Sequence, residues 1–131
     1  MASEEKKNIF DGKIEDNSKG RKYDGSKPLA GTFINVFPRS ILAIGAVILK
    51  GKEKYPDPNN WKKVEGAKVR YQESLMRHLV KHNMGILLDE ESRLPHLVHV
   101  AWNALAILEL NLMGEKGRCN AVDIFMESLL K

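Results

Sequence analysis

Two histidines stand one helical turn apart in a segment that is otherwise almost wholly apolar, LPHLVHVAWNALAILEL at 94–110. If the segment is a helix, His96, His99 and Asn103 lie within roughly 60° of one another and form one polar stripe. Two imidazoles at this spacing can bind one metal ion. Alternatively, they can join a hydrogen-bond network, because buried polar groups need partners. We predict that both face a polar pocket shared with the preceding helix, and not solvent.

The distribution of charge around this segment is uneven. Residues 50–70 contain seven basic and three acidic residues, a net charge of seven minus three, or +4. Acidic residues precede the histidines: Glu73, Asp89, Glu90 and Glu91. A cationic loop beside an acidic, histidine-bearing region is what a metal-dependent phosphate site needs, whereas the alternative is an ordinary solvated loop.

The length of 131 residues predicts a single domain. The whole chain's net charge of +4 is too small to indicate a nucleic-acid polymer as partner. Cys119 is the only cysteine, which excludes an internal disulfide and a cysteine-based metal cluster. The longest apolar run, 41–49, is too short to span a bilayer, and the first residues do not resemble a secretory signal. We therefore expect a cytoplasmic protein with no membrane partner.

Apolar periodicity predicts an all-α fold. We expect an irregular N-terminal arm with a basic loop at 1–37 and a helical nucleotide-binding region at 38–131, within one domain overall. The predicted helices run from Pro38 to about Tyr55, over 69–84, and from Pro95 to about 113, and a short amphipathic helix closes the chain. The apolar face of the second helix is predicted to consist of Val69, Leu75, Met76, Leu79 and Val80.

Four runs in series carry a resemblance to a known family: KYDGSKP at 22–28, KGKEKYPDPNNWKK at 50–63, RHL at 77–79 and LDEES…LPHLVHVAWN at 88–103. Together they resemble the phage dATP/dGTP diphosphohydrolases, which include the MazZ-type enzymes of phages that replace adenine by diaminopurine. That family looks related to the all-α MazG-like pyrophosphohydrolases, which cut a nucleoside triphosphate between the α and β phosphates with divalent metal. The resemblance implies a MazG-like helical bundle with this activity toward purine deoxynucleotides, serving the nucleotide pool of a phage-infected cell.

The resemblance also implies roles for individual residues. It implies a divalent metal, Mg²⁺ or Mn²⁺, bound by Glu73, Asp89, His96 and His99, with Glu73 or Glu91 as general base. The implied nucleotide-binding residues are Lys54, Tyr55, Asn60, Trp61, Lys62, Lys63, Arg77, His78 and Asn103. Of these, the lysines would neutralise phosphates, and Tyr55 or Trp61 would stack on the base; otherwise each is a loop aromatic that packs on the core.

Two positions depart from the family pattern. Ile86 stands where the family usually has glutamate, and Arg93 stands where it usually has glycine. Losing a carboxylate weakens a magnesium site and, with imidazole ligands, favours manganese or a later transition metal. Ile86 therefore keeps a second interpretation open, a protein that binds and sequesters a nucleotide or nucleotide signal without cleaving it. A third is a scaffold in which the histidines are purely structural.

The apolar content predicts self-association. Three long apolar segments and a terminal amphipathic stripe present more apolar surface than one short bundle covers. The MazG-like enzymes that the chain resembles are dimers or tetramers. We therefore expect a homo-oligomer, with a two-fold dimer as its simplest unit.

Overall fold

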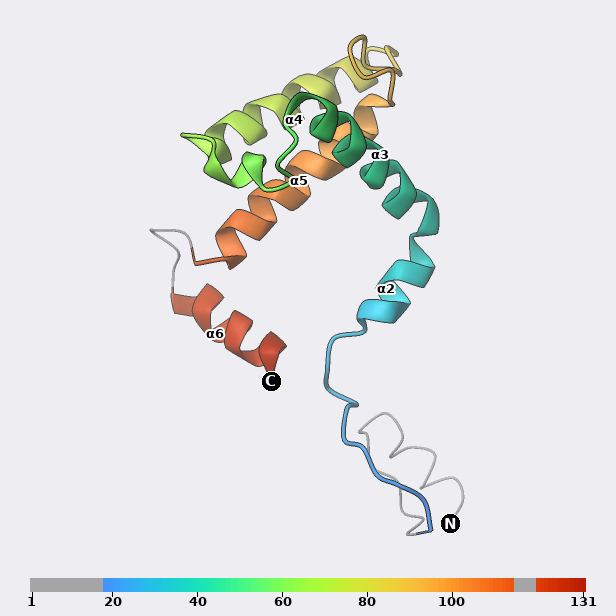
Figure 1. Cartoon of the computed structure of the whole chain (residues 1–131), viewed down its shortest axis with the longest axis vertical. Coiled ribbons are helices and arrows are strands. Elements are labelled where there is room, and N and C mark those ends of the chain that lie inside the picture. The colour runs from blue at the N-terminus through green and yellow to red at the C-terminus, as the bar shows by residue number, and fades with distance from the viewer. Residues whose placement is uncertain (1–17, 115–119) are drawn as a thin grey trace.

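The computed structural model describes residues 18–114 and 120–131 (Figure 1). The helices in these ranges are α2 (Ala30–Val36), α3 (Pro38–Lys54), the 3₁₀ helix η2 (Asn60–Lys63), α4 (Ala67–Asn83), α5 (His96–Leu112) and α6 (Asn120–Leu130). No β-strand occurs among the described residues, so the all-α prediction is confirmed. The first part of the predicted arm, 1–17, and the predicted loop around Cys119 lie outside the described residues.

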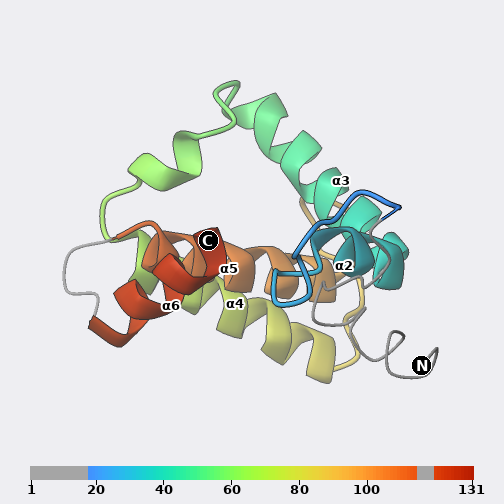
Figure 2. The same cartoon turned by 90° about the horizontal axis from the view of Figure 1, so that it is seen from below.

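Helices α4 and α5 form an antiparallel pair on which α3, α6 and η2 pack, while α2 contacts α3 (Figure 2). The direction follows from their contacts, because Tyr71 of α4 meets Trp102 of α5, whereas His78, farther along α4, meets His96 at the start of α5. Helices α3 and α6 contact α5, and η2 contacts α4. The buried residues of α5 are His96, Asn103, Ala106 and Leu110.

Local signals in the sequence set the ends of these two helices. Pro95 precedes α5 as its N-cap residue with φ −55°, a torsion angle that the proline ring fixes. Gly85 follows the last turn of α4 with φ +86°, a left-handed conformation that glycine adopts without a Cβ clash. The predicted helix positions over 69–84 and 95–113 are therefore confirmed to within about two residues.

The predicted apolar face of α4 is wrong in part. Val69, Met76 and Val80 are 65%, 49% and 55% exposed in the single chain. The side chains that meet α5 are instead Tyr71, Ser74 and His78. Hydropathy favoured the wrong face, because polar and aromatic side chains join the two helices. We call this row of contacts the polar seam.

No single helix among the described residues is long and apolar enough to cross a membrane. Helices α2 and α3 together reach the required length and composition, but their axes are bent by 91° at the break between them.

The loop between α4 and α5 is a compact hairpin with a left-handed residue. The Asp89 N–H donates to the Leu94 carbonyl at 2.8 Å, and the Arg93 N–H donates to the Asp89 carbonyl at 2.9 Å. Arg93 has φ +63°, the one positive φ at a non-glycine residue in the described part of the chain. This gives a backbone reason for the glycine that the resembling family has at this position.

Substitutions at Arg93 test this strain. Arg93→Gly removes the Cβ clash but adds freedom to the unfolded chain, so we expect the free energy of unfolding to change by between zero and about +1 kcal/mol. Arg93→Val places a β-branched side chain in the same conformation and should be about 1–2 kcal/mol less stable than Arg93→Gly. Urea unfolding of both variants gives the comparison. A valine variant as stable as the glycine variant would contradict a left-handed residue here.

Candidate metal centre

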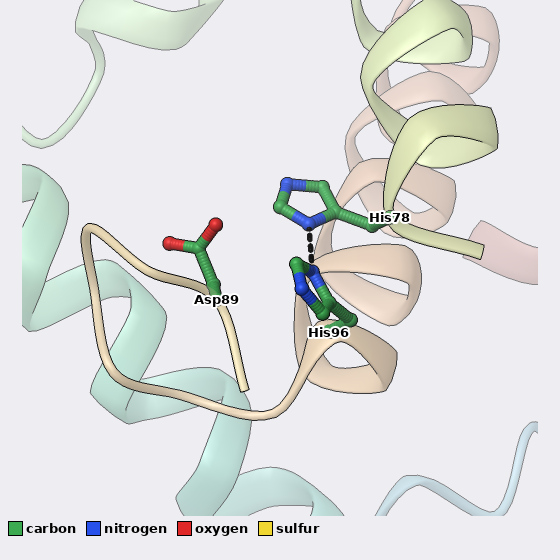
Figure 3. A group of neighbouring side chains, drawn as sticks. All are labelled: His78, Asp89 and His96. Atoms are coloured by element: carbon green, nitrogen blue, oxygen red, sulfur yellow. Dashed lines mark hydrogen bonds between the residues drawn. The ribbon is translucent and has the colours of Figure 1, made fainter. Parts of the chain in front are cut away.

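Three side chains from three elements meet at the end of the helix pair (Figure 3). His78 comes from α4, His96 is the first residue of α5, and Asp89 comes from the loop between them. The two imidazoles approach through their Nδ1 atoms at 2.8 Å. One potential ligand atom from each residue lies within 4.8 Å of the others. We call these three residues the His78–Asp89–His96 group.

A fourth side chain, His99, lies against this group. Its ring stacks on that of His78, with centroids 4.5 Å apart and planes at 13°. The His99 Nε2 lies 2.7 Å from the Ser92 Oγ and 3.9 Å from the Asp89 Oδ2. His96 is 1% exposed, and His99 is mostly buried. Both histidines therefore contact His78 of α4 and do not face solvent, as predicted.

The α4–α5 loop holds Asp89 in place through its own backbone. The Ser92 N–H donates to the Asp89 Oδ2 at 2.8 Å, and the Leu94 N–H donates to the Ser92 Oγ at 3.2 Å. Ser92 therefore links the carboxylate of Asp89 to the imidazole of His99. A carboxylate fixed in this way is already oriented, so little ordering is needed when it binds a ligand.

Asn103, a predicted nucleotide-binding residue, is only 4% exposed. Its amide nitrogen donates to the His99 carbonyl at 2.8 Å and to the Ser74 Oγ at 3.2 Å. These contacts satisfy the buried amide nitrogen, and the bond to Ser74 joins α5 to α4. In the single chain, Asn103 extends the polar seam by one helical turn beyond His99.

The electrostatic environment favours the metal-binding protonation states of His78, His99 and Asp89. Burial first, and then the nearby His99, lowers the pKa of His78 to about 4. Burial also lowers the pKa of His99, although Asp89 opposes the shift. Burial would raise the pKa of Asp89, but hydrogen bonds from Ser92 outweigh it and lower that pKa. His78 and His99 are therefore neutral near pH 7 and Asp89 is ionised, which are the forms that bind metal.

The two predicted general bases lie outside this group. Glu73 is exposed on α4, one residue before Ser74 of the seam. Glu91 is exposed on the α4–α5 loop and forms an ion pair with Lys54 at the end of α3. Arg77, next to His78 in sequence, is also exposed.

The remaining predicted nucleotide-binding residues lie on the segment that connects α3 to α4, residues 55–66. We call it the cationic loop after Lys62 and Lys63, although Asp57 and Glu65 balance their charge within it. Tyr55 is 56% exposed, and Asn60 is half-buried at the start of η2. The Lys62 Nζ lies 5.6 Å from the centroid of the Trp61 ring, and the Lys63 Nζ lies 2.8 Å from the Asp57 carboxylate. Trp61 contacts Trp102, which is six residues after His96, so this loop meets α5 roughly 9 Å along the helix from His96 and about 4.5 Å from His99.

Sequence reasoning placed His78 among nucleotide-binding residues and did not group it with His96. A signal was present, because Tyr71, Ser74 and His78 repeat at intervals of three and four residues and share one face of a helix. The apolar residues of α4 give the stronger periodic signal, so this polar stripe was not predicted to face α5.

Comparison with known proteins gives one family. The family model described as dATP/dGTP diphosphohydrolase, N-terminal, matches residues 17–118. This span contains the cationic loop, the polar seam and the His78–Asp89–His96 group. No curated protein and no solved structure shows a significant match to the chain.

The lowered pKa of His78 predicts acid destabilisation of the metal-free protein. Its pKa is about 4 in the folded chain against an ordinary 6.5, so the unfolded chain binds more protons between these values, and stability falls as the pH falls through this window. Because His78 is only partly buried, we expect a loss of roughly 1–2 kcal/mol in the free energy of unfolding between pH 7 and pH 5.

Urea unfolding in the presence of a chelator measures this loss. His78→Gln should reduce it by about half or more, since glutamine does not titrate. An equal loss in the variant and the parent would show that His78 is not the group responsible.

Proposed function

The chain belongs to the dATP/dGTP diphosphohydrolase family, and we propose that it hydrolyses dATP or dGTP to the monophosphate and pyrophosphate with a divalent metal. The observation that carries this proposal is the His78–Asp89–His96 group, which brings two imidazoles and a carboxylate together inside the matched region. The resemblance to phage enzymes further suggests control of a phage nucleotide pool, and a relation to MazG-like enzymes.

The ligand set fits a single metal ion. Ligand atoms around a tetrahedral ion at bond lengths near 2.1 Å lie about 3.4 Å apart. The two Nδ1 atoms at 2.8 Å need only a small outward movement to reach this separation. Asp89 supplies the negative charge, and His99, held by Ser92, is the nearest further ligand. Two or three imidazoles favour manganese or a later transition metal over magnesium.

The hydrogen bond between the two imidazoles has a consequence for binding. A contact between two Nδ1 atoms requires one of them to carry a proton and the other to accept it. Both Nδ1 atoms can become ligands only after this proton leaves the contact. In a neutral ring, the proton moves to the Nε2 atom of the same imidazole. When bound, the ion would lower the pKa of a water molecule and polarise a phosphoryl oxygen.

The proposed general base and the proposed phosphate-binding lysines are exposed side chains outside the metal group. Of the two candidate bases, we favour Glu91 over Glu73, because Glu91 lies two residues from Asp89 on the same loop. Its partner Lys54 is exposed and would exchange this carboxylate for a substrate phosphate. Lys62 and Lys63 of the cationic loop would contact the distal phosphates, and Tyr55 would stack on the purine ring of the nucleotide.

A second candidate function is nucleotide sequestration without cleavage. Ile86, where the resembling family has a glutamate, lies three residues before Asp89 on the same loop and is 47% exposed. A site with one carboxylate fewer would still bind a metal–nucleotide complex but would stabilise the charge of the transition state less well.

We also propose that the working unit is a homo-oligomer. The hydrophobic residues buried in the described part of the single chain are only Ala67, Ala106 and Leu110. Large apolar side chains are exposed on the outer face of α4, along α2 and α3, and on α6: Val69, Met76, Val80, Phe33, Ile34, Leu42, Leu49, Ile124, Phe125 and Leu130. Exposed apolar surface on this scale is typical of protein interfaces. A two-fold dimer is the simplest assembly that covers it.

Hydrolysis is tested by incubating the purified chain with dATP or dGTP and Mg²⁺ or Mn²⁺, and separating the products by chromatography. We expect monophosphate and pyrophosphate in a one-to-one ratio. His78→Ala should reduce turnover about 100-fold or more and weaken Mn²⁺ binding, because it removes a ligand. His82→Ala, the same change one turn farther along α4, is the matched control and should retain both. Tight nucleotide binding without any monophosphate would instead support sequestration.

Self-association is tested by light scattering at micromolar concentrations. We expect a mass of at least twice the chain's 14.8 kDa. Replacing both Met76 and Val80 by lysine should lower this mass if the outer face of α4 forms the interface, since burying two unpaired charges is costly. Replacing Glu73 and Arg77 by lysine, two exposed polar positions of α4 at the same spacing, changes the charge by the same amount and is the control. A parent protein that scatters as a monomer would rule out this assembly.

A further inference from the structure

Trp61, Tyr71 and Trp102 form an aromatic cluster that lies apart from the metal group, at the point where the cationic loop meets the helix pair. The Tyr71 and Trp102 rings meet edge to face, with centroids 5.4 Å apart and planes at 89°. The Trp61 and Trp102 rings are also edge to face, at 5.9 Å and 77°. All three side chains are partly buried. This geometry is the favoured one for aromatic pairs.

A hydrogen bond joins the backbone of the loop to this cluster. The Tyr71 hydroxyl donates to the Trp61 carbonyl at 2.5 Å. This carbonyl belongs to the residue directly before Lys62 and Lys63. The position of the two lysines on the helix pair therefore depends on a contact made by α4.

The loop is also ordered internally. The Asn60 N–H donates to the Asp57 carbonyl at 3.0 Å, and the Asn59 N–H donates to the Asp57 Oδ1 at 2.9 Å. Asp57 also pairs with Lys63, and the Lys62 ammonium lies near the face of the Trp61 ring. The loop is therefore a preformed unit, and Trp61 with Tyr71 is the contact that joins this unit to α4.

We propose that Tyr71 is a positioning residue for nucleotide binding, and that Trp61 is the anchor of the cationic loop and not a base-stacking residue. The inference rests on the proposed function, because it assumes that Lys62 and Lys63 contact substrate phosphates. Fixing the cationic loop in advance on the helix pair reduces the ordering that a nucleotide must otherwise impose when it binds. Tyr71 contributes through the loop and does not touch the reacting atoms.

Tyr71→Phe tests this role, because it removes the hydroxyl and keeps the ring. Loss of one hydrogen bond corresponds to a change of about fivefold, so we expect the KM for dATP or dGTP to rise about fivefold with kcat within about twofold. Mn²⁺ affinity should stay unchanged, since the metal group makes no contact with Tyr71. Tyr23→Phe removes a hydroxyl from an exposed tyrosine of the arm and is the matched control.

Two measurements separate failure of this inference from failure of the proposed function. Hydrogen–deuterium exchange should become faster in residues 57–66 of the Tyr71→Phe protein and stay unchanged in residues 88–99. Inorganic triphosphate binding, measured by calorimetry, reports on the lysines even if the parent protein does not turn over nucleotide, and the variant should again bind about fivefold more weakly. Faster loop exchange with unchanged triphosphate affinity and KM would overturn the positioning role. Unchanged exchange would show that the hydroxyl does not hold the loop.

Discussion

A buried imidazole needs a hydrogen-bond partner, and His96 finds one in His78 across the interface between two helices. Leaving such a group unpaired costs about 1–3 kcal/mol, so this contact restricts how far α4 can rotate or slide against α5. The same alignment continues toward the other end of the helix pair, where Ser74 contacts Asn103 and Tyr71 contacts Trp102. The histidine contact thus sets the alignment on which the remaining structure depends.

The same constraint connects the metal group to the cationic loop. The polar end of the seam carries the proposed metal ligands, while its aromatic end contacts Trp61, which directly precedes the two lysines. A nucleotide with a metal-bound phosphate and lysine-bound distal phosphates would bridge these two ends. A seam of polar and aromatic residues also leaves much apolar surface uncovered, which explains why the single chain buries so few large hydrophobic side chains. A helix face that positions polar groups in the interface cannot also contribute its side chains to an apolar core.

Much of the fold could be predicted from the sequence, because proline and glycine mark the helix ends and periodicity marks the helices. The shared azimuth of His96 and His99 followed from helical geometry alone and was confirmed. The partner of His96 could not be found in this way, since the pattern within one helix does not reveal which face of the next helix it meets. Hydropathy favoured Val80 and its apolar neighbours, whereas His78 lies in the interface. The position of Asp89 depends on loop hydrogen bonds and a left-handed Arg93, which no periodic pattern encodes.

The central claim is that the His78–Asp89–His96 group binds a catalytic divalent metal. Diffraction data collected at the manganese absorption edge, from crystals grown with Mn²⁺, test it most directly. We expect an anomalous peak within about 2.3 Å of the Nδ1 atoms of both histidines and of an Asp89 carboxylate oxygen, with the hydrogen bond between the imidazoles broken. A manganese peak at Glu73 and other exposed carboxylates, with His78 and His96 still hydrogen-bonded to each other, would contradict it.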